Sequence, residues 1–319
     1  MGKTLELNNI KIWYEEFGDS LNSSILLIMG ANANCKHWDQ EFINQLVSNN
    51  FHVIRFDNRD VGKSNWIGKE PGLNKILKFF PDFLLRFIVN SIFGLAVDNN
   101  GKFKFNDASK VQYDLSDMAK DAVSLMDALK IEKAHIVGAS MGGMITQIIA
   151  LDYPERVLSI TPIMTSPGVQ NESLSGPTKE LLEAIKKSFV FNLKGRIEDG
   201  VVEIYRQLTG SRFPFNEQKF REKLKPIIAH GNNPFSLHGA AVGASPDRTC
   251  RLHEIKVPTL VIHGTEDAIL PLDHGIAVAD GITGSKRMIM NGVGHEIPEE
   301  LFPEIINEIV ANIRRSSID

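Results

Sequence analysis

The stretch AHIVGASMGGMITQ, residues 134–147, decides the fold of this 319-residue chain. A short apolar run, 134–138, leads into a serine between glycines, and an apolar-periodic segment follows. The pattern predicts a buried strand that turns into a helix at Ser140. In such a tight reversal the strand end and the helix start nearly touch, so Gly138 and Gly142 must lack a β-carbon. The Ser140 hydroxyl is then held beside free helix N–H groups, which favour negative charge.

The Gly-x-Ser-x-Gly pattern alone is weakly specific, because it arises by chance in about one chain in ten of this length. The strand before it, the helix after it and the sheet around it favour a nucleophile over a structural Gly-rich turn. A phosphate-binding loop also joins a strand to a helix, but its Gly-Lys-Ser/Thr is absent. We therefore expect Ser140 to be a nucleophile.

Strand and helix patterns alternate along most of the chain, which predicts an α/β domain. The first residues alternate instead and predict a hairpin turned at Asn8-Asn9. Further strands are expected at 24–30, 51–57, 134–138, 157–164, 259–264 and 287–290, and helices near 38–49, at 115–130 with Ser116 as its cap, from Ser140, and at 299–314. Because these strands are continuously apolar, we expect them to be buried on both faces, as in a parallel sheet.

Two segments, 66–112 and 168–250, interrupt this alternation. We interpret them as a first cap insertion and a helical cap over the open end of the sheet. The α/β core would then comprise 1–65, 113–167 and 251–319. In the second segment, helices are expected around 178–191, 196–208 and 216–228.

The first insertion is strongly apolar over 73–97, but charges and Pro81 interrupt it too often for a membrane span. Contact of 73–97 with a membrane surface is possible. The favoured interpretation is that these residues pack over the pocket and form its acyl-binding wall.

A serine nucleophile needs a base, and the base needs an orienting acid. In this topology they should follow in the order serine, acid, histidine, on loops after strands. His295 follows the last predicted strand, and Glu266 and Asp267 follow the strand before it. Asp267 is favoured over Glu266, because a two-residue turn aims the later residue back over the sheet edge.

An oxyanion hole requires two N–H donors aimed at the carbonyl oxygen. The amide of Met141 is one candidate, and the amide of Ala31, directly after Gly30, is the other. Among the remaining histidines, His263 lies in a strand end and is expected to be structural. No spacing argues for a role of His37, His230 or His238.

These residues together resemble the α/β-hydrolase superfamily over nearly the whole chain. The resemblance includes IRFDNRDVGKS (54–64), VPTLVIHGTEDAILP (257–271) and GVGHEIP (292–298). It implies a mostly parallel eight-stranded sheet with helices on both faces and a helical cap. It also implies serine hydrolase chemistry without a cofactor. Asp60 stands where the family more often has glycine, and Asp57, Arg59 and Asp60 are expected to form a structural loop network.

Met29-Gly30 replaces the family's usual His-Gly and looks like the serine carboxylesterase subgroup that includes anthracycline methyl esterases. That resemblance implies hydrolysis of a small to medium hydrophobic carboxylic ester. Ser140 argues against dehalogenase and epoxide hydrolase chemistry, which use Asp at this position. Thioester, lipid or C–C bond hydrolysis stays open, as does a non-catalytic ligand sensor.

Composition sets limits on partners and location. A net charge of −4 does not indicate nucleic-acid binding, which requires a basic face. Cys35 and Cys250 fit two reduced thiols in a cytoplasmic protein, and no His/Asp/Cys cluster has metal-ligand spacing. We expect a small-molecule ester as the partner, no metal and no cofactor, and the sequence leaves the oligomeric state open.

Overall fold

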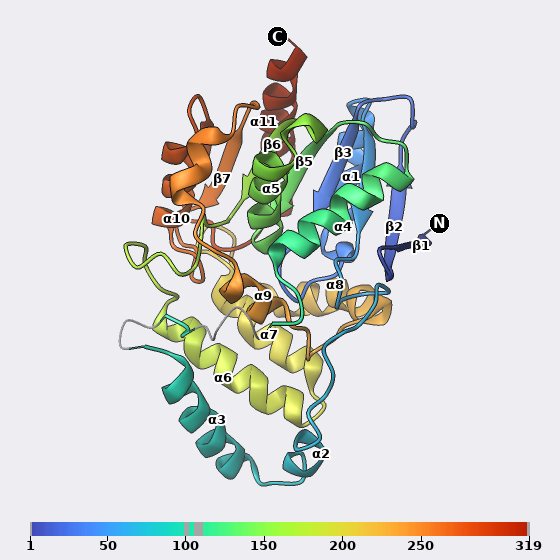
Figure 1. Cartoon of the computed structure of the whole chain (residues 1–319). Coiled ribbons are helices and arrows are strands. Elements are labelled where there is room, and N and C mark those ends of the chain that lie inside the picture. Colours follow the sequence, from blue (N-terminus) through green and yellow to red (C-terminus); the bar gives the residue numbers. More distant parts are fainter. Residues whose placement is uncertain (1, 99–101, 105–110, 318–319) are drawn as a thin grey trace.

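An eight-stranded sheet forms the centre of the computed structural model, which describes residues 2–98, 102–104 and 111–317 (Figure 1). The strand order is β1-β2-β4-β3-β5-β6-β7-β8; β1–β2 and β2–β4 are antiparallel and the later pairs are parallel. The strands are β1 (Lys3–Leu7), β2 (Ile10–Phe17), β3 (Ser24–Ile28), β4 (His52–Phe56), β5 (Ala134–Ala139), β6 (Val157–Ile163), β7 (Leu260–Gly264) and β8 (Lys286–Met290). The predicted mostly parallel, eight-stranded sheet is confirmed.

The amino-terminal hairpin turns where the sequence predicts. Asn8 and Asn9 both have positive φ, 51° and 65°, and join β1 to β2. Two consecutive residues of this kind match the twist of a two-residue hairpin, and asparagine tolerates the conformation well.

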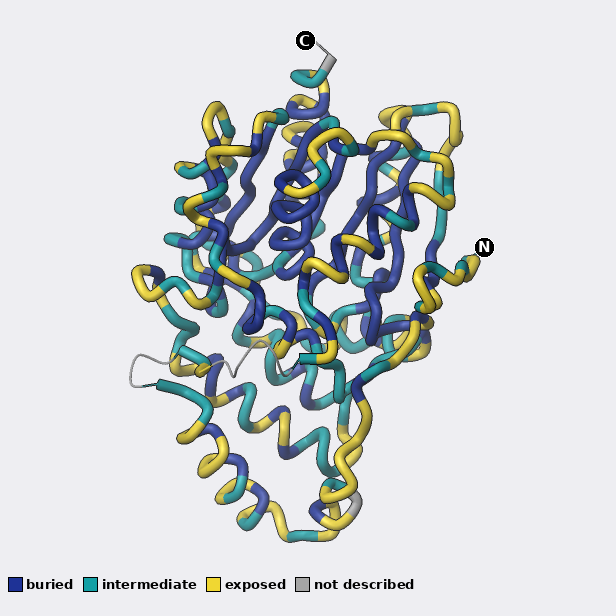
Figure 2. The backbone as a smooth tube through the Cα atoms, in the orientation of Figure 1, coloured by how far each residue is buried: buried dark blue, intermediate teal, exposed yellow. Residues whose placement is uncertain are grey.

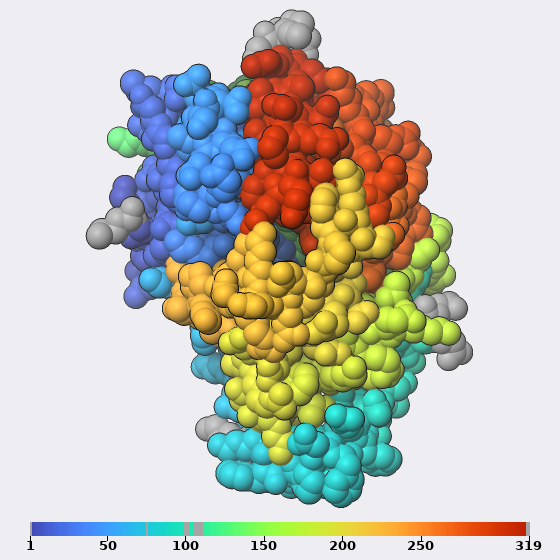
Figure 3. Space-filling model, turned by 180° about the vertical axis from the view of Figure 1, so that it is seen from behind, coloured from blue at the N-terminus to red at the C-terminus, as the bar shows by residue number. Residues whose placement is uncertain are grey.

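Helices cover both faces of the sheet. One face carries α4 (Leu115–Ala128), α5 (Met141–Asp152) and α10 (Leu272–Gly281), and the other carries α1 (Gln40–Ser48) and α11 (Phe302–Arg314) (Figures 1 and 3). Every residue of β3, β4, β5 and β7 is buried between these layers (Figure 2). This burial explains the continuous apolar runs from which a parallel sheet was predicted. Of these helices, α10 was not predicted.

The predicted cap of α4 is wrong. Asp114, not Ser116, is the N-cap: its carboxylate accepts hydrogen bonds from the amides of Ser116 and Asp117. Asp117 returns a bond to the Asp114 amide and completes a capping box. Ser116 therefore lies in the first turn, where its hydroxyl cannot cap the helix.

The two interrupting segments supply six helices beyond the carboxyl ends of the parallel strands (Figure 1). The 66–112 segment holds α2 and α3, and the 168–250 segment holds α6 to α9; residues 99–101 and 105–110 lie outside the described part of the chain. The helices are α2 (Asn74–Leu77), α3 (Asp82–Ala96), α6 (Lys179–Leu193), α7 (Ile197–Leu208), α8 (Glu217–His230) and α9 (His238–Ala244). Three of them, α6, α7 and α8, match the predicted helices closely, whereas α9 was not predicted.

α3 packs on α6 through an apolar cluster of its own. Leu85, Val89 and Phe93 of α3 are buried against Val190 of α6. Within the described ranges, no helix has both the length and the hydropathy needed to cross a bilayer.

Candidate active site

Ser140 occupies a strained turn between β5 and α5. Its backbone has φ 56° and ψ −119°, a conformation that costs non-glycine residues about 1–3 kcal/mol. Two hydrogen bonds hold it there. The Ser140 amide donates to the Ile163 carbonyl at 2.9 Å, and the Thr165 hydroxyl donates to the Ser140 carbonyl at 2.7 Å. The end of β6 thus fixes the conformation of the turn.

The glycines around Ser140 are required by close backbone approach. A β-carbon on Gly138 would overlap the carbonyl oxygen of Gly142, and one on Gly142 would overlap the carbonyl oxygen of Ile28. A β-carbon on Gly143 would fall 2.7–2.9 Å from the Thr165 side chain. For Gly138 the predicted reason, contact between strand end and helix start, is confirmed. For Gly142 the reason differs, because the crowding comes from the end of β3 rather than from β5.

Gly142→Ala is therefore expected to lower the free energy of unfolding by about 1–3 kcal/mol, because the methyl group meets backbone that cannot rotate away. The matched control is Gly239→Ala in α9, where a β-carbon would meet nothing within 4 Å. Urea denaturation followed by tryptophan fluorescence measures both variants. Equal midpoints for the two would contradict the crowding at the turn.

Asp267 and His295 form a direct pair. His295, in the loop after β8, donates from Nδ1 to Oδ2 of Asp267 at 2.6 Å. The other carboxylate oxygen, Oδ1, accepts from the amides of Ile269 and Leu270 at 3.0 and 2.8 Å. Asp267 is only 4% exposed. The pair places an oriented imidazole at the carboxyl edge of the sheet.

The charge state of Asp267 follows from its surroundings. Burial alone would raise the pKa of Asp267. The interaction with His295 and the hydrogen bonds from His263 and His295 outweigh burial, and they hold this pKa well below its usual range. Asp267 is therefore ionised at neutral pH and fixes the proton on Nδ1 of His295, which leaves Nε2 of that ring as an acceptor.

His263 also contacts this acid, which sequence reasoning did not anticipate. Its Nε2 donates to the Leu270 carbonyl at 2.8 Å and lies 3.3 Å from Oδ2 of Asp267. The residue was expected to be structural, and both contacts are of that kind, since they hold the loop that carries Asp267.

Glu266, the alternative acid, points elsewhere. Its two carboxylate oxygens accept hydrogen bonds from the amide and the hydroxyl of Ser211, each at 2.7 Å. These same bonds lower the pKa of Glu266. Glu266 therefore ties the loop after α7 to the core, next to the point where the His295 amide donates to the Leu208 carbonyl.

The loop after β3 brings its backbone against Ser140. A β-carbon on Gly30 would lie 3.0 Å from Cβ and 3.6 Å from Oγ of Ser140. Among the described residues, the amides of Ala31 and Met141 donate no hydrogen bond to a protein acceptor. Both groups thus remain available as oxyanion donors.

His238 of α9 positions this loop. Burial lowers the pKa of His238 to about 4, so the ring is neutral at physiological pH. Its Nδ1 accepts from the Asn32 amide at 2.9 Å, and its Nε2 donates to the Arg59 carbonyl at 2.6 Å. Asn32 itself has φ 59°. His238, from the 168–250 segment, therefore fixes the turn that carries Ala31, a contact across 206 positions that no local pattern could indicate.

Asp57, Arg59 and Asp60 form the structural network expected of them. Arg59 makes a paired contact with Asp121 of α4 at 2.7 and 2.8 Å. Asp60, with φ 73°, accepts bonds from the Tyr113 hydroxyl and from backbone amides of both interrupting segments. The positive φ explains why glycine is commoner at this position in the family.

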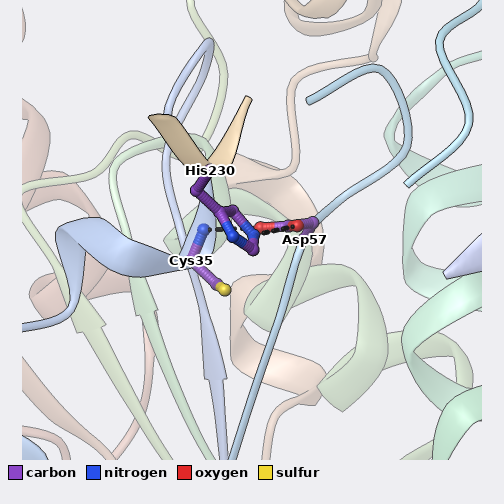
Figure 4. A group of neighbouring side chains, drawn as sticks. All are labelled: Cys35, Asp57 and His230. Carbon is purple, nitrogen blue, oxygen red and sulfur yellow. Dashed lines mark hydrogen bonds and ion pairs between the residues drawn. The ribbon is translucent and has the colours of Figure 1, made fainter. Parts of the chain in front are cut away.

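Cys35 and His230 gather around Asp57 (Figure 4). Asp57 accepts from the Cys35 amide at 2.8 Å and from Nε2 of His230 at 2.7 Å, and the Lys63 amide also donates to it. Burial, then the charge of Asp57, raises the pKa of the Cys35 thiol well above its usual value. The three side chains are close enough to share a metal, and the hydrogen bonds from Cys35, Lys63 and His230 to Asp57 hold them together without one. We assign the cluster a structural role that joins α8 to the core.

Comparison with known proteins fixes the family. Residues 24–300 match the α/β hydrolase fold. The chain belongs to this family. It is 26% identical to rhodomycin D methylesterase DauP of Streptomyces sp. (strain C5), with 98% of this chain and 97% of that one covered. This similarity confirms the resemblance to anthracycline methyl esterases that the sequence indicated.

One further relative and one solved structure are also similar to this chain. A 2-hydroxy-6-oxo-6-phenylhexa-2,4-dienoate hydrolase of Comamonas testosteroni is 35% identical, but over 56% of this chain and 61% of that one. The enol-lactonase of Burkholderia xenovorans LB400 superposes with a TM-score of 0.70 at 18% identity, covering 98% of this chain and 100% of that structure. The second similarity concerns the fold alone.

Proposed function

We propose that this protein is a serine hydrolase that cleaves a carboxylic ester of a small to medium hydrophobic substrate. The observation that carries the proposal is the 2.6 Å bond between His295 and Asp267, on the same sheet edge as the strained Ser140. The methylesterase similarity over nearly the full length supports ester hydrolysis as the reaction class.

In the proposed reaction, Nε2 of His295 takes the hydroxyl proton of Ser140 while Oγ attacks the ester carbonyl carbon. The amides of Ala31 and Met141 stabilise the oxyanion. His295 returns the proton to the alkoxy oxygen, the alcohol leaves, and an acyl-enzyme remains. Water, deprotonated by His295, then attacks this ester and releases the carboxylic acid. Asp267 keeps the imidazole in the required tautomer throughout.

None of these steps uses a cofactor or a metal ion. A small molecule is the only partner the proposal requires, and a cytoplasmic location stays part of it, supported by the two free thiols of Cys35 and Cys250. The division into a core with two caps, at the boundaries predicted above, also stays part of the proposal.

A second candidate is C–C bond hydrolysis, because the dienoate hydrolases share 29–35% identity over about half of this chain. Such a reaction would use the same fold and the same serine, with a ketone rather than an ester as the electrophile. The full-length similarity to methylesterases favours the ester, since it includes the cap segments that shape a pocket.

The test is a substrate panel with purified protein. We expect turnover of p-nitrophenyl acetate and butyrate, and of a methyl ester on a polycyclic aromatic scaffold. We expect kcat/KM for the best ester to exceed that for 2-hydroxy-6-oxo-6-phenylhexa-2,4-dienoate by about 100-fold or more.

If kcat/KM were higher for the dienoate than for the best ester, C–C bond hydrolysis would replace ester hydrolysis as the proposed function. No turnover of either class, together with tight binding of one of them, would instead make the chain a ligand sensor. Profiling across acyl-chain length then defines the acyl preference of an active enzyme.

A further inference from the structure

Exposed apolar side chains are concentrated in one part of the molecule. Ten large hydrophobic residues of the described chain are exposed, and seven of them lie between positions 73 and 95. Scattered apolar residues are normal on a protein surface, but a cluster of several hundred Å² marks an interaction site. We name this cluster the apolar tip; its side chains are 57–79% exposed and comprise Leu73, Ile76, Phe79, Phe83, Phe87, Ile92 and Leu95.

The helix α3 is apolar on two opposite sides. Leu85, Val89 and Phe93 recur every four residues and are buried against α6. Phe83 and Phe87 follow the same spacing half a turn away and are 75% and 69% exposed. A helix that is hydrophobic all round is ordinarily covered on both sides. The outer side of α3 therefore lacks a covering layer within the described chain.

The favoured interpretation was that residues 73–97 pack over the pocket and form its acyl-binding wall. The location of the tip excludes this role for its side chains. α2 and α3 form the end of the molecule farthest from the carboxyl terminus, beyond α6, and Figure 2 shows alternating buried and exposed residues along α3 (Figures 1 and 2). The same end is visible from behind in Figure 3. The buried residues of α3 contact α6, while the tip faces outward. The tip side chains are therefore not the acyl-binding wall of a pocket.

The charges around the tip favour an anionic partner. Residues 66–97 hold four Lys or Arg and two Asp or Glu, although the whole chain has a net charge of −4. Asp82 is paired with Lys194 at 3.4 Å. Lys78 and Arg86 are exposed and make no ion pair within the described residues, and Nζ of Lys78 lies 5.1 Å from the ring centre of Phe79.

We propose that the apolar tip docks on the surface of an anionic lipid bilayer. α3 lies in the interfacial plane, with its outer apolar side among the acyl chains and with Lys78 and Arg86 at the headgroups. At 15 residues, α3 is too short to span a bilayer, which requires about 20. A second copy of this chain fits less well, because a symmetric contact would bring Lys78 and Arg86 of both copies together.

Vesicle flotation with the full chain tests this proposal without any need for catalytic activity. Vesicles of phosphatidylcholine alone are compared with vesicles that also contain phosphatidylglycerol. We expect the wild type to float with the mixed vesicles. The combined Phe79→Ser, Phe83→Ser and Phe87→Ser variant should lower the bound fraction by about tenfold or more. Leu21→Ser is the matched control, because Leu21 is 92% exposed outside the tip and its loss should change nothing.

The charge contribution is tested separately. The Lys78→Glu, Arg86→Glu variant should lower binding to the mixed vesicles by about fivefold or more and should leave binding to phosphatidylcholine unchanged. Thermal unfolding checks that all variants fold, which we expect since every altered side chain is exposed.

Two results would overturn the proposal. One is a wild-type protein that stays out of the lipid fraction with both compositions. The other is a wild-type dimer that becomes monomeric in the triple serine variant, with no vesicle binding by either, because a second copy of the chain would then cover the tip.

Discussion

Ser140→Ala is expected to lower kcat/KM for p-nitrophenyl butyrate by about 10⁴-fold or more, with little change in the free energy of unfolding. The substitution removes the nucleophile but keeps a β-carbon in the same strained turn. The backbone bonds to Ile163 and Thr165 do not involve the hydroxyl of Ser140. Residual activity would come from the oxyanion donors, which are backbone groups. Steady-state kinetics and thermal unfolding measure the two effects.

The matched control is Ser116→Ala. Ser116 lies exposed in the first turn of α4, and Asp114 rather than Ser116 caps that helix. Both kinetics and unfolding should stay at the wild-type value in this control. A Ser140→Ala protein that kept most of its esterase activity would remove the acyl-enzyme from the mechanism.

Asp267→Asn is expected to lower kcat/KM by about 10⁴-fold. The carboxamide can present an N–H group to Nδ1 of His295, which then carries its proton on Nε2 and can no longer accept one from Ser140. The substitution keeps the size of the side chain. It also keeps an oxygen for the amides of Ile269 and Leu270, so the fold should persist. The same esterase assay measures the effect.

Glu266→Gln separates the two candidate acids. Because Glu266 binds Ser211 rather than His295, its loss should change kcat/KM by less than about tenfold. If Glu266→Gln were the inactive variant and Asp267→Asn the active one, the orientation of His295 would have to come from Glu266.

The strand-to-helix turn at Ser140 is predictable from sequence because its causes are local. Contact between strand end and helix start forces glycine at position 138, and an apolar run marks β5. The crowding at Gly142 comes from β3, so the pattern indicates that glycine without indicating its cause. The position of His295 follows in the same way from the end of the last strand. Chain order and strand ends therefore predict which loops carry the candidate residues, and the preference for Asp267 over Glu266 follows from turn length.

The contacts that hold those loops are not predictable in this way, because they join distant parts of the chain. His238 binds Asn32 across 206 positions, and Glu266 binds Ser211 across 55. Neither histidine nor glutamate has a local pattern that distinguishes such a role from an exposed side chain. The capping error at Ser116 has a different origin, because the helix begins two residues earlier than a cap at Ser116 requires. Asp114 is its N-cap and accepts hydrogen bonds from the amides of Ser116 and Asp117.

Composition likewise cannot decide which side of an apolar helix is covered. Residues 73–97 are as apolar as a pocket wall, and only packing against α6 reveals that half of them face outward. Hydrophobic periodicity identifies a buried side when the other side is polar. α3 lacks that contrast, so its sequence supports both interpretations.

The central claim is that Ser140, His295 and Asp267 act together in one proton relay. Mass spectrometry after reaction with a fluorophosphonate tests this claim most directly. One phosphonyl group per chain should form and should map to the peptide that contains Ser140. The adduct should be absent in Ser140→Ala and should form at least about 100-fold more slowly in Asp267→Asn. An adduct on another residue, or full-rate labelling of Ser140 in Asp267→Asn, would contradict the proposed proton relay.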